Sequence, residues 1–299
     1  MNKIIDIDII FDNIHSYTNI IELCRTCIDF YKYKKYIIYI KLNKEYSLEY
    51  YMNDNFKSLI HSKIINPSKQ LSIYLQDSIN KIDLNKLNNL HTLNLSNCNQ
   101  IIDVSLLSNI DTLNLSECNN IVEVSKLNAR ILDLSNCSNL LCVSSLSNVQ
   151  SLNLSNCRKL NYISYLPKIY SLNISFCYSI DDVNKFYNCT KLIIQYCTQI
   201  TDVSKLGNIK ELDLSHCHGI TDVSKLGYVE KLRLCNCHGI YDISALKYNK
   251  ILDISRCHLV RDFSNQINIH TLNISNCYIP NFSMFSNVKN LIAEQCKIV

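Results

Sequence analysis

The sequence has few of the residues that form phosphate-binding loops or membrane spans. Its 299 residues include only 4 glycines, 3 prolines and no tryptophan, and only 19% of them are charged. No glycine-rich phosphate-binding motif occurs, and no apolar run approaches the roughly 20 residues that a membrane-spanning helix needs. The net charge of +4 is small for a dedicated nucleic-acid-binding protein. We therefore expect neither nucleic acid nor a membrane as a partner.

Signatures of catalysis are missing as well. The sequence contains no G-x-S-x-G, no H-E-x-x-H and no set of kinase motifs. We therefore predict that the protein is not an enzyme and carries no cofactor. The first residues, MNKIIDIDII, place acids where a secretion signal is apolar. This favours a soluble protein of the cytoplasm, with the nucleus as an alternative.

Cysteine and leucine are abundant, and they recur at a fixed spacing. Eleven of the 16 cysteines, from Cys98 to Cys296, are separated by 19 or 20 residues. A leucine stands five positions before each of these cysteines, and leucine or isoleucine stands three positions before it everywhere except at Ala293. A variant of D-V-S-x-L follows in most units, as in Asp202 to Leu206. Several columns that repeat together over eleven units predict a solenoid.

The pattern L-x-x-L-x-L-x-x-[NC] with this period resembles the leucine-rich repeat. L-x-L forms a short strand whose two leucines point to one side, and one unit cannot bury that side without its neighbours. The predicted fold is of the α/β class. It is a leucine-rich-repeat solenoid with a parallel sheet on the concave face and short turns or 3₁₀ segments on the convex face. Eleven repeats occupy residues 90–299, and residues 61–89 hold a linker and a degenerate first repeat.

The cysteine column is predicted to pack in the turn that follows each strand. A buried thiol acts there as a small hydrophobic group and as a weak donor to backbone carbonyls. Aspartates of the return segment, such as Asp103 and Asp222, are expected to bond to the nearby backbone. His218, His238 and His258 each follow a cysteine of the column, so they should lie in a row and not converge on a metal ion. No metal site is predicted.

Residues 1–60 lack the repeat and are predicted to form two or three helices, the third over residues 35–40. Part of this region resembles an F-box, and the cysteine-containing repeats are similar to those of F-box/leucine-rich-repeat proteins encoded by large DNA viruses of amoebae. The resemblance implies that the protein is of the type encoded by these viruses and that its F-box-like region docks a Skp-type adaptor of a ubiquitin ligase. The alternative is a helical cap that only shields the solenoid edge. The residues that match the F-box pattern are Ile20, Leu23, Cys27, Phe30 and Tyr31.

The open face of the sheet is the expected binding surface. Most units repeat asparagine or aspartate and serine there, as at Asn94 and Ser96, and departures from this pattern gather between Cys177 and Cys257. Aromatic residues beside arginine are typical of interface hot spots. The protein is therefore predicted to hold a protein target on this face as the substrate receptor of a ubiquitin ligase. The runner-up is a stand-alone interaction or scaffold protein with no ubiquitin link. For the aromatic residues themselves, the alternative is a ladder that merely stabilises the sheet, or neutral drift. The predicted partner-binding residues are Phe176, Gln195, Tyr196, His216, Arg233 and Arg256.

Overall fold

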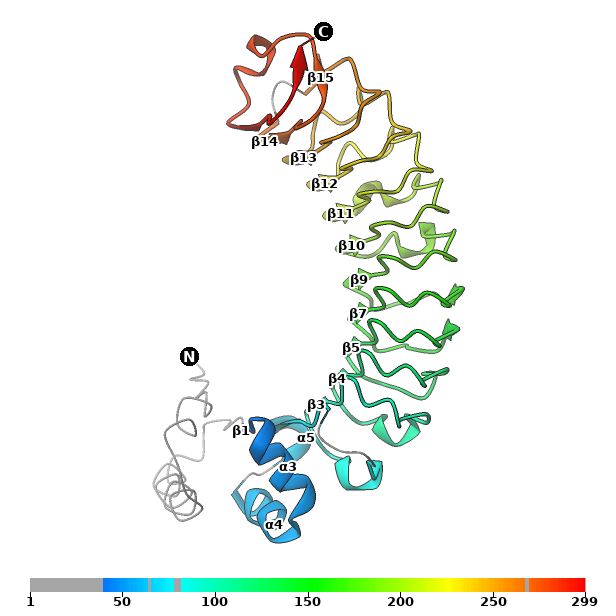
Figure 1. Cartoon of the computed structure of the whole chain (residues 1–299), viewed down its shortest axis with the longest axis vertical. Helices are drawn as coiled ribbons and strands as arrows, with labels where there is room; N and C mark the ends of the chain where they lie inside the picture. Colours follow the sequence, from blue (N-terminus) through cyan, green and yellow to red (C-terminus); the bar gives the residue numbers. More distant parts are fainter. Residues whose placement is uncertain (1–39, 64–65, 78–81, 267–268, 299) are drawn as a thin grey trace.

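The computed structural model describes residues 40–63, 66–77, 82–266 and 269–298. Its main feature is a curved stack of repeats whose strands line the inner side of the arc, whereas turns and short helices line the outer side (Figure 1). Thirteen strands of the described residues form one parallel sheet, and they follow one another in chain order. These strands are β1 (Ile40–Lys41), β2 (Leu71–Tyr74), β3 (Thr92–Asn94), β4 (Thr112–Asn114), β5 (Ile131–Asp133), β7 (Ser151–Asn153), β9 (Ser171–Asn173), β10 (Lys191–Ile193), β11 (Glu211–Asp213), β12 (Lys231–Arg233), β13 (Ile251–Asp253), β14 (Thr271–Asn273) and β16 (Asn290–Ile292).

The register of the sheet places equivalent residues of successive repeats side by side. Leu172, Leu192 and Leu212 are direct partners in neighbouring strands, and all three are buried. The same register includes the degenerate first repeat, where Ile73 pairs with Leu93 as predicted. Each column of the sequence is therefore a row of contacts along the solenoid, and the leucine rows form one continuous core.

The convex side consists of short return segments. Aspartates begin many of them and accept a hydrogen bond from the backbone N–H two residues later, at 2.9 Å from Asp202 to Ser204 and 2.8 Å from Asp222 to Ser224. The predicted 3₁₀ segments and local aspartate bonds are thus confirmed. The elements of this side are η1 (Leu84–Leu87), η2 (Ser105–Leu107), η3 (Asn184–Phe186), η4 (Leu206–Asn208), η5 (Ser283–Phe285) and the strand pairs β6 (Cys142–Val143) with β8 (Tyr162–Ile163) and β15 (Tyr278–Ile279) with β17 (Lys297–Ile298).

A small helical region precedes the repeats and packs on strand β2. It contains α3 (Lys44–Met52), α4 (Asp54–Lys63) and α5 (Pro67–Gln70). Tyr50 and Phe56 are buried in it, and the Ser47 hydroxyl accepts a 2.8 Å hydrogen bond from the backbone N–H of Tyr74 in β2. The predicted helical region before the repeats is present. The predicted boundary after residue 60 falls inside α4.

The predicted helix over 35–40 lies outside the described residues except for its last residue. That residue, Ile40, begins strand β1 and pairs with Leu71, so the predicted end of the helix is wrong at this position. The buried Ile40 and Leu42 point to the same side, and the Leu42 N–H donates to Ser72 O at 3.0 Å. Pairing with the sheet edge supplies backbone hydrogen bonds there, so tertiary contacts override the local helical pattern. The five F-box-like residues lie outside the described residues. Within the described ranges, no helix is long and apolar enough to span a membrane.

Candidate interaction surface

Each strand of the repeats leads into a turn, and most of these turns are closed by one side chain. The residue four positions before the cysteine is usually asparagine or aspartate, and its Oδ1 accepts the backbone N–H of the serine two positions later. Asn114 and Ser116 make this bond at 2.8 Å, and Asp213 and Ser215 make it at 3.0 Å. We call these positions the Asx column. The repeated Asn-x-Ser spacing, which looks neutral in the sequence, therefore has a structural role that the spacing itself indicates.

The residue directly before each cysteine of the column has a left-handed backbone. In all eleven repeats its φ lies between 53° and 63°. We call these positions the turn column. Asparagine, which tolerates this conformation, occupies five of them, whereas a bulky residue pays a penalty of roughly 1–2 kcal/mol there. Phe176, Tyr196, His216 and Arg256 all adopt it.

Three successive side chains of the turn column stack on one another. The ring centroids of Phe176 and Tyr196 lie 4.5 Å apart, and those of Tyr196 and His216 lie 4.0 Å apart, with interplanar angles of 13° and 11°. His216 Nδ1 then contacts Asn236 Nδ2 at 3.0 Å. The rings cover one another's faces, and the Tyr196 side chain remains exposed at 36%. The predicted aromatic column is therefore present. Its binding role stays a prediction.

Three repeats depart from the Asx column. Asparagine or aspartate is replaced there by Ile193, Arg233 and Ile292, and the serine that follows is replaced by Gln195, Cys235 and Glu294. Gln195 Nε2 instead reaches the next repeat and donates to Asp213 Oδ2 at 2.8 Å. These three repeats therefore lack the side-chain bond that closes the turns of the other repeats, and they carry different side chains at these positions.

The two predicted arginines extend from the concave face without ionic partners. Arg233 lies between Asp213 and Asp253 in the register of β11, β12 and β13, and Arg256 lies in the turn column. Both side chains are exposed. Neither forms an ion pair within the described part of the chain. Burial, the imidazole of His218 and the guanidinium of Arg256 hold the pKa of His216 below its ordinary value.

Lysines and glutamates alternate at the start of the same strands. Lys191 and Lys231 contact the Glu211 carboxylate at 3.8 Å and 2.5 Å. One position earlier, Lys210 and Lys250 flank Glu230 in the same way. The Lys231 hydrogen bond lowers the pKa of Glu211. Each carboxylate therefore lies between two ammonium groups, which leaves an excess of positive charge beside the arginines.

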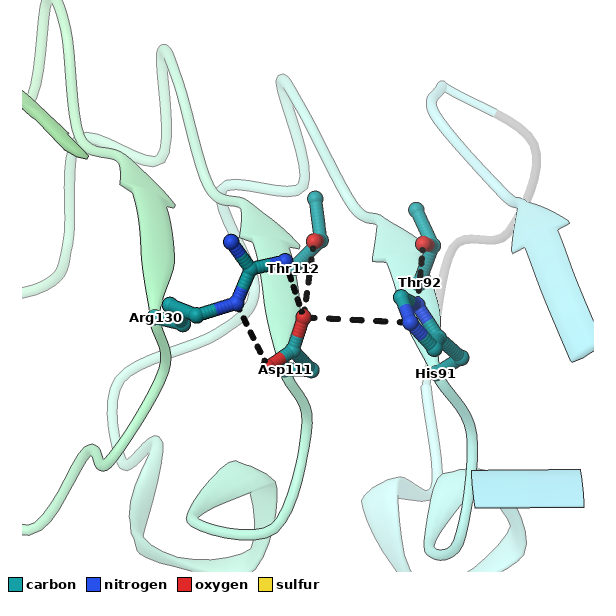
Figure 2. A network of polar contacts seen from close by, with 5 residues as sticks. All are labelled: His91, Thr92, Asp111, Thr112 and Arg130. Atoms are coloured by element: carbon teal, nitrogen blue, oxygen red, sulfur yellow. Dashed lines mark hydrogen bonds and ion pairs between the residues drawn. The ribbon is translucent and has the colours of Figure 1, made fainter. Parts of the chain in front are cut away.

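The other end of the concave face carries a different network (Figure 2). The Arg130 guanidinium donates to both oxygens of Asp111, at 3.2 Å and 3.0 Å, and His91 approaches the same carboxylate at 3.8 Å. Next to this network is an open hollow of about 320 Å³ lined by hydroxyl and amide side chains such as Thr112 and Asn114. The sequence did not single out this hollow. Its lining also includes apolar residues such as Ile131 and Leu132, and this mixture indicates no particular ligand.

The cysteine column is a row of buried donors. Each thiol points at the carbonyl of the residue three positions before the cysteine of the previous repeat, for example Cys118 Sγ at 3.1 Å from Leu95 O and Cys217 Sγ at 2.8 Å from Ile194 O. Burial raises the pKa of Cys217 to about 12, so the thiol stays protonated and unreactive. The predicted packing role is confirmed. The 14 cysteines that the structure describes are free thiols.

The histidines that follow these cysteines stack in a row. The rings of His218 and His238 are 4.9 Å apart and nearly parallel at 2°, and those of His238 and His258 are 5.6 Å apart. Their nitrogens therefore do not converge on one point. Among the described residues, no group of three or more histidine, cysteine or acidic side chains is arranged to hold a metal ion.

Comparisons with known proteins give only structural likenesses. No family model and no curated protein matches the chain. An internalin, InlF, from Listeria monocytogenes is 24% identical, with a TM-score of 0.48 over 72% of this chain and 77% of that one. The functional domain of InlJ from the same bacterium, which includes a cysteine ladder, is 14% identical, with a TM-score of 0.37 over 73% and 64%. The leucine-rich repeat domain of APL1B is 13% identical, with a TM-score of 0.42 over 83% and 82%.

The fold is a leucine-rich-repeat solenoid. This assignment rests on the chain's own 20-residue period, its parallel register and its row of leucines. The structural likenesses are too low for a function to be transferred from any of these proteins. The target and the residues that bind it must therefore be argued from the concave face itself.

Proposed function

We propose that this solenoid is a protein-interaction module that holds a protein target on its concave face. The residues that carry the proposal are six departures from the repeat, here called the target face. Folding needs only the inward residues, so outward departures that give up local stability require another reason. The target face consists of Phe176, Gln195, Tyr196, His216, Arg233 and Arg256.

The single observation that supports the target face most strongly is the replacement of favoured turn residues by bulky ones in adjacent repeats. Phe176, Tyr196 and His216 have φ values of 61°, 60° and 63°, where asparagine occurs elsewhere in the column. Stacking returns about 0.5–1.5 kcal/mol for each ring pair, which is comparable with the backbone penalty. Stacking alone therefore gives little net gain. It does not explain Arg233 or Arg256, which stack on nothing among the described residues.

Site-specific cross-linking in the full-length protein tests this proposal. A photoreactive side chain at position 196 should capture a target, whereas one at Tyr228, 76% exposed in the return segment on the convex side, should not. The captured protein is then purified and its binding measured directly. Tyr196→Ala combined with Arg233→Ala should abolish that binding, while the variant still unfolds in one cooperative transition at a melting temperature well above that of the assay.

A matched control is available on the convex side and away from the target face. Tyr228 also stacks on a neighbour, Tyr248, at 5.3 Å, and Arg158, which directly follows Cys157, is an exposed arginine outside the target face. Tyr228→Ala with Arg158→Ala should therefore retain full binding. If the control pair loses binding as strongly as the target-face pair, the target lies elsewhere on the molecule.

The amino-terminal sequence supports a second component of the proposal. We infer that Ile20, Leu23, Cys27, Phe30 and Tyr31, which match an F-box pattern, dock a Skp-type adaptor. The captured protein would then be brought to a ubiquitin ligase in the cytoplasm or nucleus. The alternative is a stand-alone scaffold that binds the same target without any link to ubiquitin.

Co-purification with a purified Skp–cullin adaptor separates these two functions. The intact chain should capture the adaptor, and Leu23→Glu should lose it. Arg233→Ala, which changes only the target face, should retain adaptor capture. Failure of the intact chain to bind the adaptor would leave the scaffold function and would not affect the proposal for the concave face.

A further inference from the structure

We propose that the target face recognises an extended, carboxylate-rich segment of its protein partner through Arg233 and Arg256. This inference rests on the proposed function, because it specifies the chemistry of the target held there. It begins from the two exposed guanidinium groups on the concave face. A guanidinium presents a planar fork of donors that fits a carboxylate with two parallel hydrogen bonds.

The two carboxylates nearest to Arg233 along the sheet already accept hydrogen bonds from other residues of the chain. In Asp213 and in Asp253, Oδ1 accepts both the backbone N–H and the hydroxyl of a serine, and Oδ2 accepts an amide N–H from a neighbouring repeat. Both carboxylates are thus engaged on each oxygen by neutral donors. No ion pair joins Arg233 to either of them in the part of the sheet that the structure describes. The Arg233 guanidinium is therefore available to an acid from outside the chain.

The surroundings add positive potential. Glu211 and Glu230 each lie between two lysines, and Asp213 and Asp253 flank Arg233. The four lysines and two arginines of this region exceed these four carboxylates by two charges, so the region remains net positive. The exposed edges of the aromatic stack contribute in the same direction, because an aromatic ring is electropositive at its edge and electronegative on its face. The stacked faces of Phe176, Tyr196 and His216 cover one another. A nucleic-acid base needs a free aromatic face for stacking, so this arrangement favours a peptide over a single-stranded oligonucleotide.

The spacing of the two arginines indicates the shape of the partner. Arg233 stands four positions before its cysteine, and Arg256 stands one position before the cysteine of the next repeat. With about 4.8 Å between strands and about 3.3 Å per residue along a strand, their Cα atoms are at most about 11 Å apart. Two carboxylates three residues apart lie on one face of an extended polyproline II segment, about 9 Å from each other. The target segment is therefore extended and carries acids at positions i and i+3.

Fluorescence anisotropy with defined probes tests the inference on the full-length protein. The probe is a fluorescein-labelled decapeptide of glycine and serine with glutamates three positions apart. A peptide with glutamine at those positions and a ten-nucleotide oligothymidylate serve as comparisons. The glutamate peptide should bind, and Arg233→Gln and Arg256→Gln should each weaken its binding about tenfold. Arg158→Gln, which removes an exposed arginine outside the target face, should have no effect.

Several outcomes would overturn the inference. These are equal binding of the glutamate and glutamine peptides, unchanged affinity in both arginine variants, or oligothymidylate binding with the same arginine dependence. The glutamate peptide could fail to bind while cross-linking at position 196 still captures a target, and the Tyr196→Ala, Arg233→Ala pair loses that target. This result would refute only the acidic chemistry of the inference. Loss of both results would refute the proposed function as well. Melting temperatures of the variants equal to that of the parent would exclude unfolding as the cause.

Discussion

Arg233→Asn is expected to stabilise the protein while it removes part of the proposed binding. Arg233 is exposed, so its replacement gives up little packing. Asparagine at this position of the Asx column would accept the backbone N–H of Cys235, as Asn114 accepts that of Ser116 at 2.8 Å. A hydrogen bond of this kind contributes about 0.5–1.5 kcal/mol net. The free energy of unfolding should therefore rise by about 1 kcal/mol, and the melting temperature by about 2 °C.

Urea denaturation followed by circular dichroism measures this change, and a reciprocal variant provides the control. Asn114→Arg deletes the same turn bond in a repeat outside the target face and should lower the free energy of unfolding by about 1 kcal/mol. The glutamate peptide should bind Arg233→Asn about tenfold more weakly and bind Asn114→Arg normally. A midpoint for Arg233→Asn at or below that of the parent chain would refute the idea that the arginine is kept at a cost in stability.

Two further predictions concern the turn that each cysteine packs into. Cys217→Asp should lower the free energy of unfolding by about 3 kcal/mol or more, because it buries an acid against the Ile194 carbonyl. Cys217→Ser should have a much smaller effect. An unchanged melting temperature for the aspartate variant would contradict the packing role. Burial, followed by the positive charge of neighbouring groups, holds the pKa of His216 and His238 below 6.5. The unfolded chain therefore binds protons that the folded chain does not, and stability should fall as the pH drops from 6.5 toward these lowered pKa values. His238→Asn should make this loss of stability smaller, which urea denaturation midpoints measured between pH 7 and pH 5 would show. A pH profile of the variant identical to that of the parent chain would contradict the assignment to His238.

The solenoid could be predicted closely because each repeat is packed on a near copy of itself. Leu192 touches Leu172 and Leu212, so the environment of a column position is supplied by the same column. A period of 20 residues then fixes the register without knowledge of distant contacts. The row of thiols and the aromatic stack follow for the same reason, since residues that share a column must lie side by side.

The sequence was less informative where the contacts are not periodic. Ile40 follows a helix-like pattern but pairs with the sheet edge, which only the folded repeats create. For a similar reason, the sequence does not show whether the acids of the concave face pair with Arg233. Arg233 has acids on both sides in the register, and only the hydrogen bonds of the structure reveal that Asp213 and Asp253 are engaged elsewhere. The exposed guanidinium is thus a structural finding, although the arginine itself was singled out from the sequence.

The repeat also makes the cost of each departure measurable within one chain. Asparagine in the turn column and asparagine or aspartate in the Asx column define what local stability favours. Tyr196 and Arg233 depart from these preferences in nearby repeats, and each departure is worth about 1 kcal/mol. Drift would scatter such losses along the solenoid, whereas a binding surface gathers them where one partner can contact them together. Departures also occur at Glu117, Ile292 and Gln295, but every aromatic residue and arginine in these two columns lies between Phe176 and Arg256. This grouping is the strongest reason to look for a partner on this part of the concave face.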